Sequence, residues 1–152
     1  TPHIVIDETG AVTKPLQPAF YMRGTADENP NASYDLPGGG WDNEIVDQNG
    51  DFTNSVFLAP VSGFYMFVYQ HRFYGALEGK FYKVRFVLSN GIHEFIKYFE
   101  TDSEPGGQGS ITCLAYMDAS DTCTLQTTTD QTVDGWQHFG DTFTSYAGFL
   151  VC

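Results

Sequence analysis

Basic side chains are scarce in this chain. Its 152 residues include 7 Lys and Arg but 19 Asp and Glu, and the formal net charge is −12. Nucleic-acid binding needs a basic surface that releases counterions from phosphates, and an anionic bilayer attracts a basic surface too. No run of about 18 apolar residues exists that could cross a membrane as a helix. We therefore expect neither a nucleic-acid partner nor membrane insertion.

Motifs of catalysis and of zinc binding are also missing. The cysteines Cys113, Cys123 and Cys152 form no Cys-x-x-Cys pair, the spacing typical of zinc sites. The histidines are scattered, and no Ser or Cys lies in a recognisable nucleophile motif. The PGGG segment at 37–40 lacks the Lys and the helix of a phosphate-binding loop. The sequence does not exclude a pair of glycosidase carboxylates, because the fold brings such residues together and they have no fixed spacing along the chain. We expect a protein that binds and is not an enzyme.

Aromatic residues and glycine are abundant, with 13 Phe, 9 Tyr and 16 Gly. This composition, with Thr and Val, favours strands joined by tight turns. The apolar runs are short and separated by turn residues, which predicts an all-β sandwich, most plausibly a jelly roll. Residues 25–40 and 101–109 are expected to form loops. The strands are expected at 18–23, 41–46, 56–58, 64–73, 82–88, 92–99, 110–117, 122–129 and 146–151.

The length favours one domain, which we place at 18–152. Residues 1–17 read as an N-terminal lead-in, a small hairpin or an extended arm around the turn that ends at Gly10. Ser89-Asn90-Gly91 predicts a hairpin, and the turn at 118–121 predicts a second one between its flanking strands.

The segment from Phe64 to Tyr69 is apolar on both faces of its predicted strand. Alternate residues share a face, so one set is Tyr65, Phe67 and Tyr69 and the other is Phe64, Met66 and Val68. In a single sandwich only one face of a strand meets the core. The second face must meet another chain or another layer, and the pattern therefore predicts an oligomer.

Three motifs, in order along the chain, resemble the globular-head domains of complement C1q, which are relatives of the tumour necrosis factor fold. They are Phe57-x-x-Pro60-x-x-Gly63-x-Tyr65-x-Phe67, the strand-turn-strand of 110–125, and the closing YAGFLV strand of 146–151. The resemblance implies a C1q/TNF-like jelly roll assembled as a homotrimer, with trimer or core residues Phe64, Tyr65, Phe67, Tyr69 and Phe149. The family's Gly-Asp turn is Ser120-Asp121 here, which costs backbone freedom if that position needs a positive φ.

A second resemblance lies in the lead-in. Residues 7–20, with the pattern Asp7-x-x-Gly10-x-Val12-Thr13-x-Pro15-x-Gln17-Pro18-Ala19-Phe20, resemble the approach to C1q-like domains at the ends of marine phage tail fibres and other viral structural proteins. This implies a virion protein at a tail-fibre or appendage tip that recognises a receptor, for which we expect a cell-surface glycan. The alternatives are a secreted invertebrate C1q-domain lectin of innate immunity and a structural trimerisation knob that binds nothing.

Carbohydrate sites combine an aromatic platform with carboxylate and amide groups on loops. Both tryptophans lie in Gly-bearing segments outside the resembling motifs. The alternative for each Trp is that it caps the core or the trimer edge. The predicted ligand-binding residues are Tyr34, Trp41, Asp42 and Asn43 in one segment, and Trp136, Gln137 and His138 in the other.

Oxygen side chains alternate at Asp47, Asn49 and Asp51, like the opening of a calcium loop. Phe52 and Leu58 stand where an EF-hand needs Gly and Glu, so an Asx-rich turn is the alternative. C1q-like heads often hold calcium, and three chains would carry 3 × −12 = −36 formal charges, which cations near the axis would offset.

Cys113 and Cys123 are equidistant from the turn at Asp118. In a regular hairpin they would face each other on neighbouring strands. Both a disulfide and two packed thiols fit this spacing.

Overall fold

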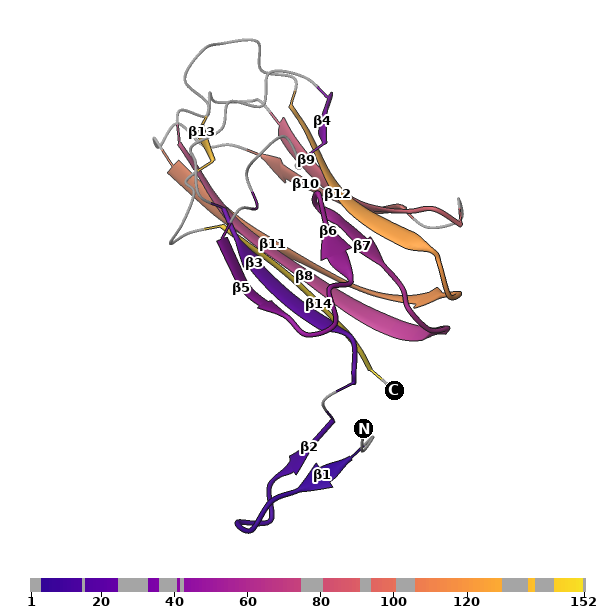
Figure 1. Cartoon of the computed structure of the whole chain (residues 1–152). Coiled ribbons are helices and arrows are strands. Elements are labelled where there is room, and N and C mark those ends of the chain that lie inside the picture. The colour runs from indigo at the N-terminus through magenta and orange to yellow at the C-terminus, as the bar shows by residue number, and fades with distance from the viewer. Residues whose placement is uncertain are drawn as a thin grey trace.

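In a computed structural model the described residues are 4–14, 16–24, 33–35, 41, 43–74, 81–90, 94–100, 106–129, 137–138 and 144–151. Their regular elements are all β-strands. Two antiparallel sheets face each other as a sandwich, and a separate two-stranded hairpin extends from one end (Figure 1). The prediction of an all-β jelly-roll sandwich is confirmed.

Each sheet is named after one of its long inner strands, β12 or β8. In the β12 sheet the order is β10 (Glu94–Glu100), β9 (Phe81–Leu88), β12 (Thr122–Thr129), β7 (Val56–Leu58) and β6 (Phe52–Thr53), with β4 (Ser33–Asp35) also on β12. In the β8 sheet the order is β11 (Gly106–Met117), β8 (Gly63–Tyr74), β14 (Ser145–Leu150), β3 (Ala19–Arg23) and β5 (Asn43–Asp47), with β13 (Gln137–His138) also on β8. The hairpin pairs β1 (Val5–Ile6) with β2 (Val12–Thr13).

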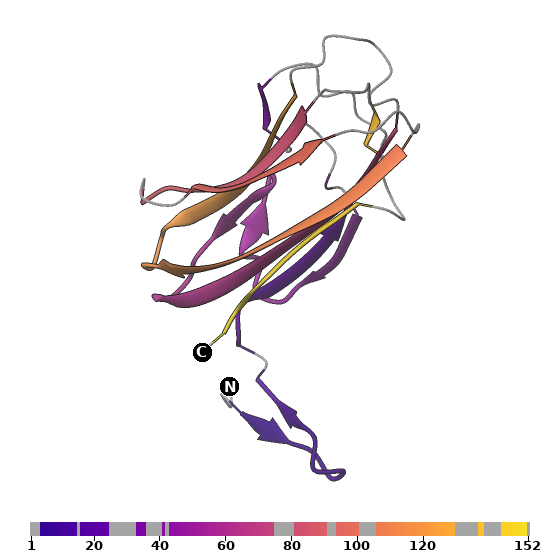
Figure 2. The same ribbon diagram turned by 180° about the vertical axis from the view of Figure 1, so that it is seen from behind.

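The two ends of the sandwich differ. The N- and C-termini lie at one end, which we call the base, together with the hairpin (Figure 1). Strands β4 and β13 lie at the opposite end, which we call the apex, and the reverse view shows the same arrangement (Figure 2). The fold therefore separates the hairpin from β4 and β13 by the length of the sandwich.

The prediction of a hairpin around 118–121 is wrong. Strand β11 pairs with β8 along its whole length, and β12 pairs with β9, β7 and β4, so the turn crosses from one sheet to the other. The backbone of Ala59 holds this turn: its carbonyl accepts from Ser120 N at 2.8 Å and its N–H donates to the Asp121 carbonyl at 2.8 Å. Turn residues specify a chain reversal but not which sheet receives the next strand.

Two expected loops also contain strand. Strand β11 begins at Gly106, inside the segment expected to be a loop, because it extends the pairing of β8 as far as Tyr74. Strand β4 lies within a Pro- and Gly-rich segment and pairs with Gln126 to Thr128 of β12. Pairing with a neighbouring strand outweighs local turn propensity in both places.

Aromatic rings fill the space between the sheets. Tyr146 of β14 is fully buried, and its ring lies 4.9 Å from that of Phe20, 5.6 Å from Phe52 and 5.8 Å from Phe86, measured between centroids. The rings of Phe57 and Phe67 are also fully buried and lie 5.5 Å apart. Edge-to-face and tilted contacts at these distances add to the stabilisation from burial.

Gly148 provides the space that two of these rings need. A Cβ at this position would lie 2.5 Å from a ring carbon of Phe20 and 2.7 Å from one of Phe67. Both rings are buried, so neither can move away without opening the core. The Gly of the closing strand is therefore a packing requirement.

We predict that Gly148→Ala lowers the free energy of unfolding by about 3 kcal/mol or more, because the added methyl group overpacks two buried rings. Gly63→Ala is the matched control. Its Cβ would meet only the end of the Leu150 side chain, at 2.7 Å, and we expect a loss of about 1 kcal/mol at most. Urea unfolding followed by circular dichroism measures both variants, and equal losses would contradict this account of Gly148.

Ser120 has a φ of 77°, so the turn that carries Gly-Asp in C1q-like heads does need a left-handed residue here. Left-handed backbone costs an L-residue about 1–2 kcal/mol. Gly avoids this cost, but it also gives the unfolded chain more conformational freedom, which offsets part of the stabilisation. We predict that Ser120→Gly stabilises the protein by up to about 1 kcal/mol. Ala119→Gly, at a neighbour without positive φ, is expected to destabilise it. A lower melting temperature for Ser120→Gly would disprove the strain.

Candidate binding and assembly surfaces

The outer face of the β8 sheet carries an uncovered group of apolar side chains. We call Phe64, Met66, Leu114, Tyr116 and Phe149 the apolar patch. The strand register places Phe64 opposite Tyr116, and Met66 opposite both Leu114 and Phe149, so all five share one face. Phe64, Leu114, Tyr116 and Phe149 are between 39% and 50% exposed. The rings of Phe64 and Tyr116 meet edge to face at 5.4 Å.

The same face becomes polar toward the apex. Continuing along β8 and its neighbours, the register brings Gln70 beside Ser110 and Ser145, and Ser145 beside Arg23. Arg23 lies over the ring of Tyr21 at 5.7 Å and donates from Nε to its hydroxyl at 3.3 Å. On β8, β11 and β14 the exposed large apolar side chains are thus confined to the base half, and Ile45 and Val46 of the edge strand β5 are exposed as well.

The residues predicted for the core or trimer divide between the two faces of β8. Tyr65, Phe67 and Tyr69 are fully buried between the sheets. Phe64 and Phe149 lie on the outer face, where nothing in a single chain covers them among the described residues. One face of the aromatic run therefore builds the core, and the other is the apolar patch.

Trp41 lies in the core, which is the alternative to a sugar platform. Its side chain is 5% exposed, and its ring packs edge to face on Tyr69 at 6.1 Å and against Tyr146 at 5.8 Å. An indole enclosed by these rings cannot stack on a ligand in this structure. The Gly-rich sequence around Trp41 does not reveal this burial, because it carries no strand periodicity.

The other predicted ligand residues are placed mainly by their strands. Tyr34 lies on β4, and Gln137 and His138 lie on β13, so these three belong to the apex (Figures 1 and 2). Asn43 begins β5 opposite Arg23 and is partly buried. Asp42 and Trp136 lie outside the described residues. Ligand binding at these residues stays a prediction.

The segment 47–51 forms a turn that the side chain of Asp47 closes. Both carboxylate oxygens of Asp47 accept backbone N–H groups, from Asp51 at 3.0 Å and Phe52 at 3.2 Å. Burial raises the pKa of Asp51, a hydrogen bond from Asn49 opposes this rise, and the charge of Asp47 adds to it. Across the described residues no three His, Cys, Asp or Glu side chains converge on a point where a metal could sit. Calcium binding at Asp47, Asn49 and Asp51 stays a prediction.

The same turn has a function that the sequence did not reveal. The Gln48 side-chain amide donates to the Lys14 carbonyl at 2.9 Å, and that of Asn49 donates to the Leu16 carbonyl at 3.5 Å. The Gln17 amide donates to the Leu150 carbonyl. These three amides, which we call the amide clamp, attach the linker between the hairpin and β3 to the base of the domain. Isolated Gln and Asn residues give no signal of such contacts in a sequence.

The thiols of Cys113 and Cys123 are free, buried and located on opposite sheets. The expectation that they occupy neighbouring hairpin strands is wrong, because β11 and β12 do not pair. Burial raises the pKa of each thiol to about 12, and the hydroxyl of Tyr146 donates to Cys123 Sγ at 3.5 Å. At neutral pH such thiols pack as small apolar groups and do not act as nucleophiles.

Comparison with known proteins agrees with this architecture. The globular domain of zebrafish complement 1qA protein superposes with a TM-score of 0.70 at 15% identity, covering 90% of this chain and 98% of that one. A crystal structure of murine APRIL at pH 5.0 superposes with a TM-score of 0.65 at 8% identity, covering 89% and 99%. No protein-family model and no curated protein matches the sequence.

The chain therefore has the C1q/TNF-like jelly-roll fold, as its three motifs predicted. At these identities the likeness establishes the fold alone. Among the described residues no helix is long and apolar enough to cross a membrane.

We predict that the free energy of unfolding falls as the pH rises from about 9 toward 12. The unfolded thiols lose their protons near their usual pKa of 9.0, whereas the folded ones keep theirs up to about 12. The folded state therefore binds more protons in this range, and each thiol lowers stability by about 1.4 kcal/mol per pH unit. Urea titrations between pH 8 and 11 measure the slope. A Cys123→Ala variant should show a shallower slope, and an unchanged slope would contradict the assignment.

Proposed function

We propose that this protein is a homotrimeric binding head at the tip of a viral or phage tail fibre, where it recognises a cell-surface glycan. The role is one of binding, not catalysis. The main support for the trimer is the apolar patch, whose four most exposed side chains are 39% to 50% accessible to water in one chain. Contiguous apolar surface of this kind marks an interaction site.

Several features support self-assembly around a symmetry axis. The apolar patch gathers side chains of the three neighbouring strands β8, β11 and β14 on one face of the sheet, in its base half. Phe64 and Tyr116 already hold each other in an edge-to-face contact, which lowers the entropy that a partner must remove. Complete burial of a large apolar side chain is worth roughly 1.5–3 kcal/mol, and the uncovered half of each side chain remains available for this purpose.

Target recognition would use the apex. Strands β4 and β13 carry Tyr34, Gln137 and His138, and they lie at the end of the sandwich opposite the termini (Figure 1). Together with Asp42, Asn43 and Trp136 these residues remain our proposed ligand residues. Three copies of one apex site facing the same way would raise the affinity for a cell surface by avidity, roughly 10²- to 10⁴-fold.

Calcium is part of the proposal as a counter-charge. Three chains would bring 3 × −12 = −36 formal charges together, and bound cations would lower that repulsion. The carboxylates of Asp47 and Asp51 are the proposed ligands in each chain. A secreted invertebrate lectin would use the same surfaces outside a virion, and a trimerisation knob would use only the apolar patch.

A charge inside the apolar patch tests the assembly. We predict that Phe64→Asp and Leu114→Asp each convert the trimer to monomers, because a carboxylate would be buried without a partner at the interface. Leu58→Asp is the matched control: Leu58 is 48% exposed, like Leu114 at 50%, but lies on β7 of the other sheet. Circular dichroism confirms the fold, and equilibrium sedimentation with and without a calcium chelator gives the mass. Variants that keep the wild-type mass would exclude the apolar patch as the interface.

The same proteins test the target. Wild-type trimer is expected to bind immobilised cell-surface glycans, Leu58→Asp to bind equally, and Phe64→Asp monomer to lose at least 100-fold in apparent affinity. Trp136→Ala should abolish binding without changing the mass. A trimer that binds no glycan and no cell would instead support the structural knob.

A further inference from the structure

The N-terminal hairpin presents an apolar face to solvent. Ile6 and Val12 are directly opposite in the pairing of β1 with β2, and Ile4 lies on the same face, two residues before Ile6. The exposed fractions of Ile4, Ile6 and Val12 are 56%, 68% and 60%. A two-stranded hairpin has no second layer and is marginally stable in water by itself. Such a face is therefore expected to pack against something.

The hairpin is held at both ends. In its turn, Asp7 Oδ1 accepts from the backbone of Thr9 at 2.8 Å and of Ala11 at 2.9 Å, while Gly10 takes the positive φ of 85° that closes the turn. At its other end the amide clamp fixes the carbonyls of Lys14 and Leu16 to the domain. These contacts direct the hairpin away from the base instead of folding it back on its own sheets.

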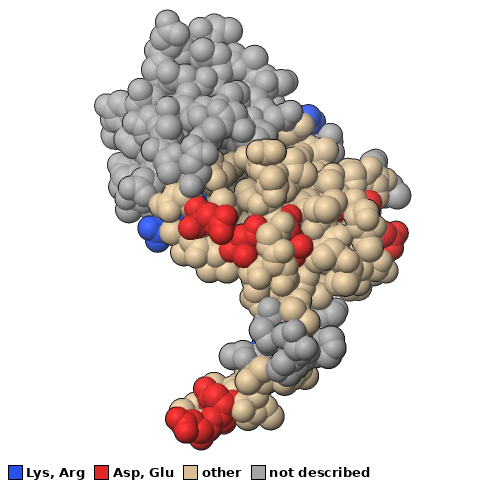
Figure 3. Space-filling model, in the orientation of Figure 1, with Lys and Arg blue, Asp and Glu red and all other residues tan. Residues whose placement is uncertain are grey.

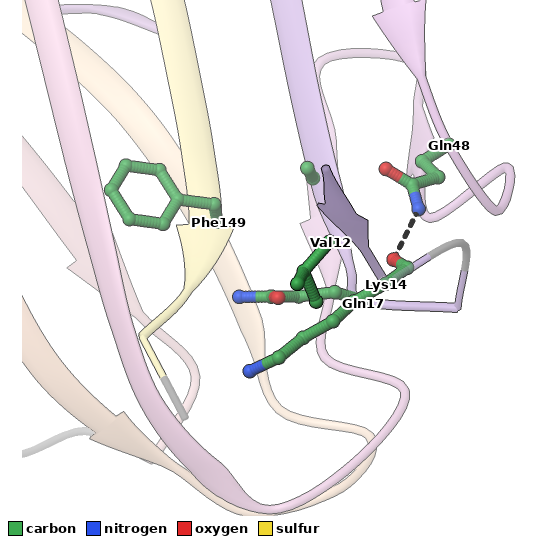
Figure 4. Close-up of a pocket in the computed structure, with 6 residues that line it drawn as sticks. Val12, Lys14, Gln17, Gln48 and Phe149 are labelled. Carbon is green, nitrogen blue, oxygen red and sulfur yellow. Dashed lines mark hydrogen bonds between the residues drawn. The ribbon is translucent and has the colours of Figure 1, made fainter. Parts of the chain in front are cut away.

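A notch of about 410 Å³ lies between the hairpin and the domain. Figure 4 shows Val12, Lys14 and Gln17 on one side of it and Phe149 on the other. Val12 belongs to the apolar face of the hairpin, and Phe149 belongs to the apolar patch. The notch therefore lies between the two apolar surfaces, and Lys14, Gln17 and Gln48 make half of its lining polar.

The charged residues of the hairpin and the notch limit which partner could cover these two surfaces. Lys14 is the charged residue of the notch, whose remaining lining residues are Val12, Gln17, Ala19, Gln48 and Phe149. Acidic side chains stand at the tip of the hairpin, where Asp7 and Glu8 are (Figure 3), and they disfavour an anionic lipid surface. Phe149 lines the notch and also belongs to the apolar patch, through which the proposed trimer meets the next copy. Continuity with that interface therefore favours a second copy of this chain as the partner.

We propose that the hairpin and the notch of each copy grip a second copy of this chain, so that the trimer interface extends from the apolar patch onto residues 4–14. The inference rests on the trimer of the proposed function and adds a separate surface to it. Each copy then contacts the next through the sheet face and through Ile4, Ile6 and Val12. The repeated contact closes into a ring, as heterologous interfaces do when the rotation allows it.

Substitutions confined to the hairpin test this inference. We predict that Ile6→Thr/Val12→Thr raises the concentration at which the trimer dissociates at least tenfold, measured by mass photometry of the full chain over a dilution series. Both changes keep β-branched residues, so the hairpin can still form. Lys14→Glu, which reverses the charge of the notch, is expected to weaken the trimer as well. Leu58→Thr, on β7 of the other sheet, should leave the dissociation unchanged.

The outcomes separate this inference from the proposed trimer. If the wild-type trimer dissociates at the same concentration as both Ile6→Thr/Val12→Thr and Lys14→Glu, the hairpin makes no contact with the next copy. The inference is then overturned, and the apolar patch remains as the interface. A wild-type chain that is monomeric at all concentrations overturns both. Binding of the wild type to phosphatidylcholine vesicles that Ile6→Thr/Val12→Thr abolishes, without any change in assembly, would make the hairpin a membrane contact and would also overturn the inference.

Discussion

Strand β8 carries aromatic and aliphatic side chains on both of its faces, and both sets have to be covered from water. The rest of the structure depends on how each face is covered. The inner face is covered by the β12 sheet, where Tyr65, Phe67 and Tyr69 reach complete burial. Gly148 of the adjacent strand leaves room for Phe67 and Phe20, and Tyr146 fills the centre of the resulting ring cluster. The outer face keeps Phe64 half exposed, so one chain alone leaves the requirement unmet.

Because of this constraint, the base and the apex of the sandwich expose different kinds of surface. The apolar patch, the notch and the hairpin all belong to the base half, where the amide clamp fixes the hairpin to the domain. The outer face becomes polar toward the apex, where β4 and β13 lie. We interpret the base as the part that meets other copies and the apex as the part that meets a target.

Much of the fold was predictable from the sequence, for a local reason. The pattern of 64–69 divided the residues of β8 into two apolar faces without showing which of them is the core, and the three motifs that resemble C1q heads predicted the C1q/TNF-like jelly roll. Both signals are local, because strand periodicity and short motifs depend on residues a few positions apart. The resemblance also indicated that Ser120, in place of the family's Gly, costs backbone freedom if its position needs a positive φ, and the structure gives it a φ of 77°.

What could not be predicted depends on contacts between distant segments. The turn at 118–121 looked like a hairpin because its residues specify only a reversal, while the pairing of β11 with β8 decides the sheet. Trp41 looked like a loop residue because its burial depends on Tyr69 and Tyr146, far along the chain. The segment 47–51 has the residue types of a calcium loop, yet Asp47 caps its own turn and Gln48 reaches the linker at Lys14.

The most direct test of the central claim, that copies of the chain cover the outer face of β8, is the mass of the unmodified protein in solution. Multi-angle light scattering over a range of concentrations measures it without assumptions about shape. The account predicts a single species of three times the 16.9 kDa chain mass. A species of 16.9 kDa that persists at high concentration would contradict it, because Phe64 and the apolar patch would then remain in water.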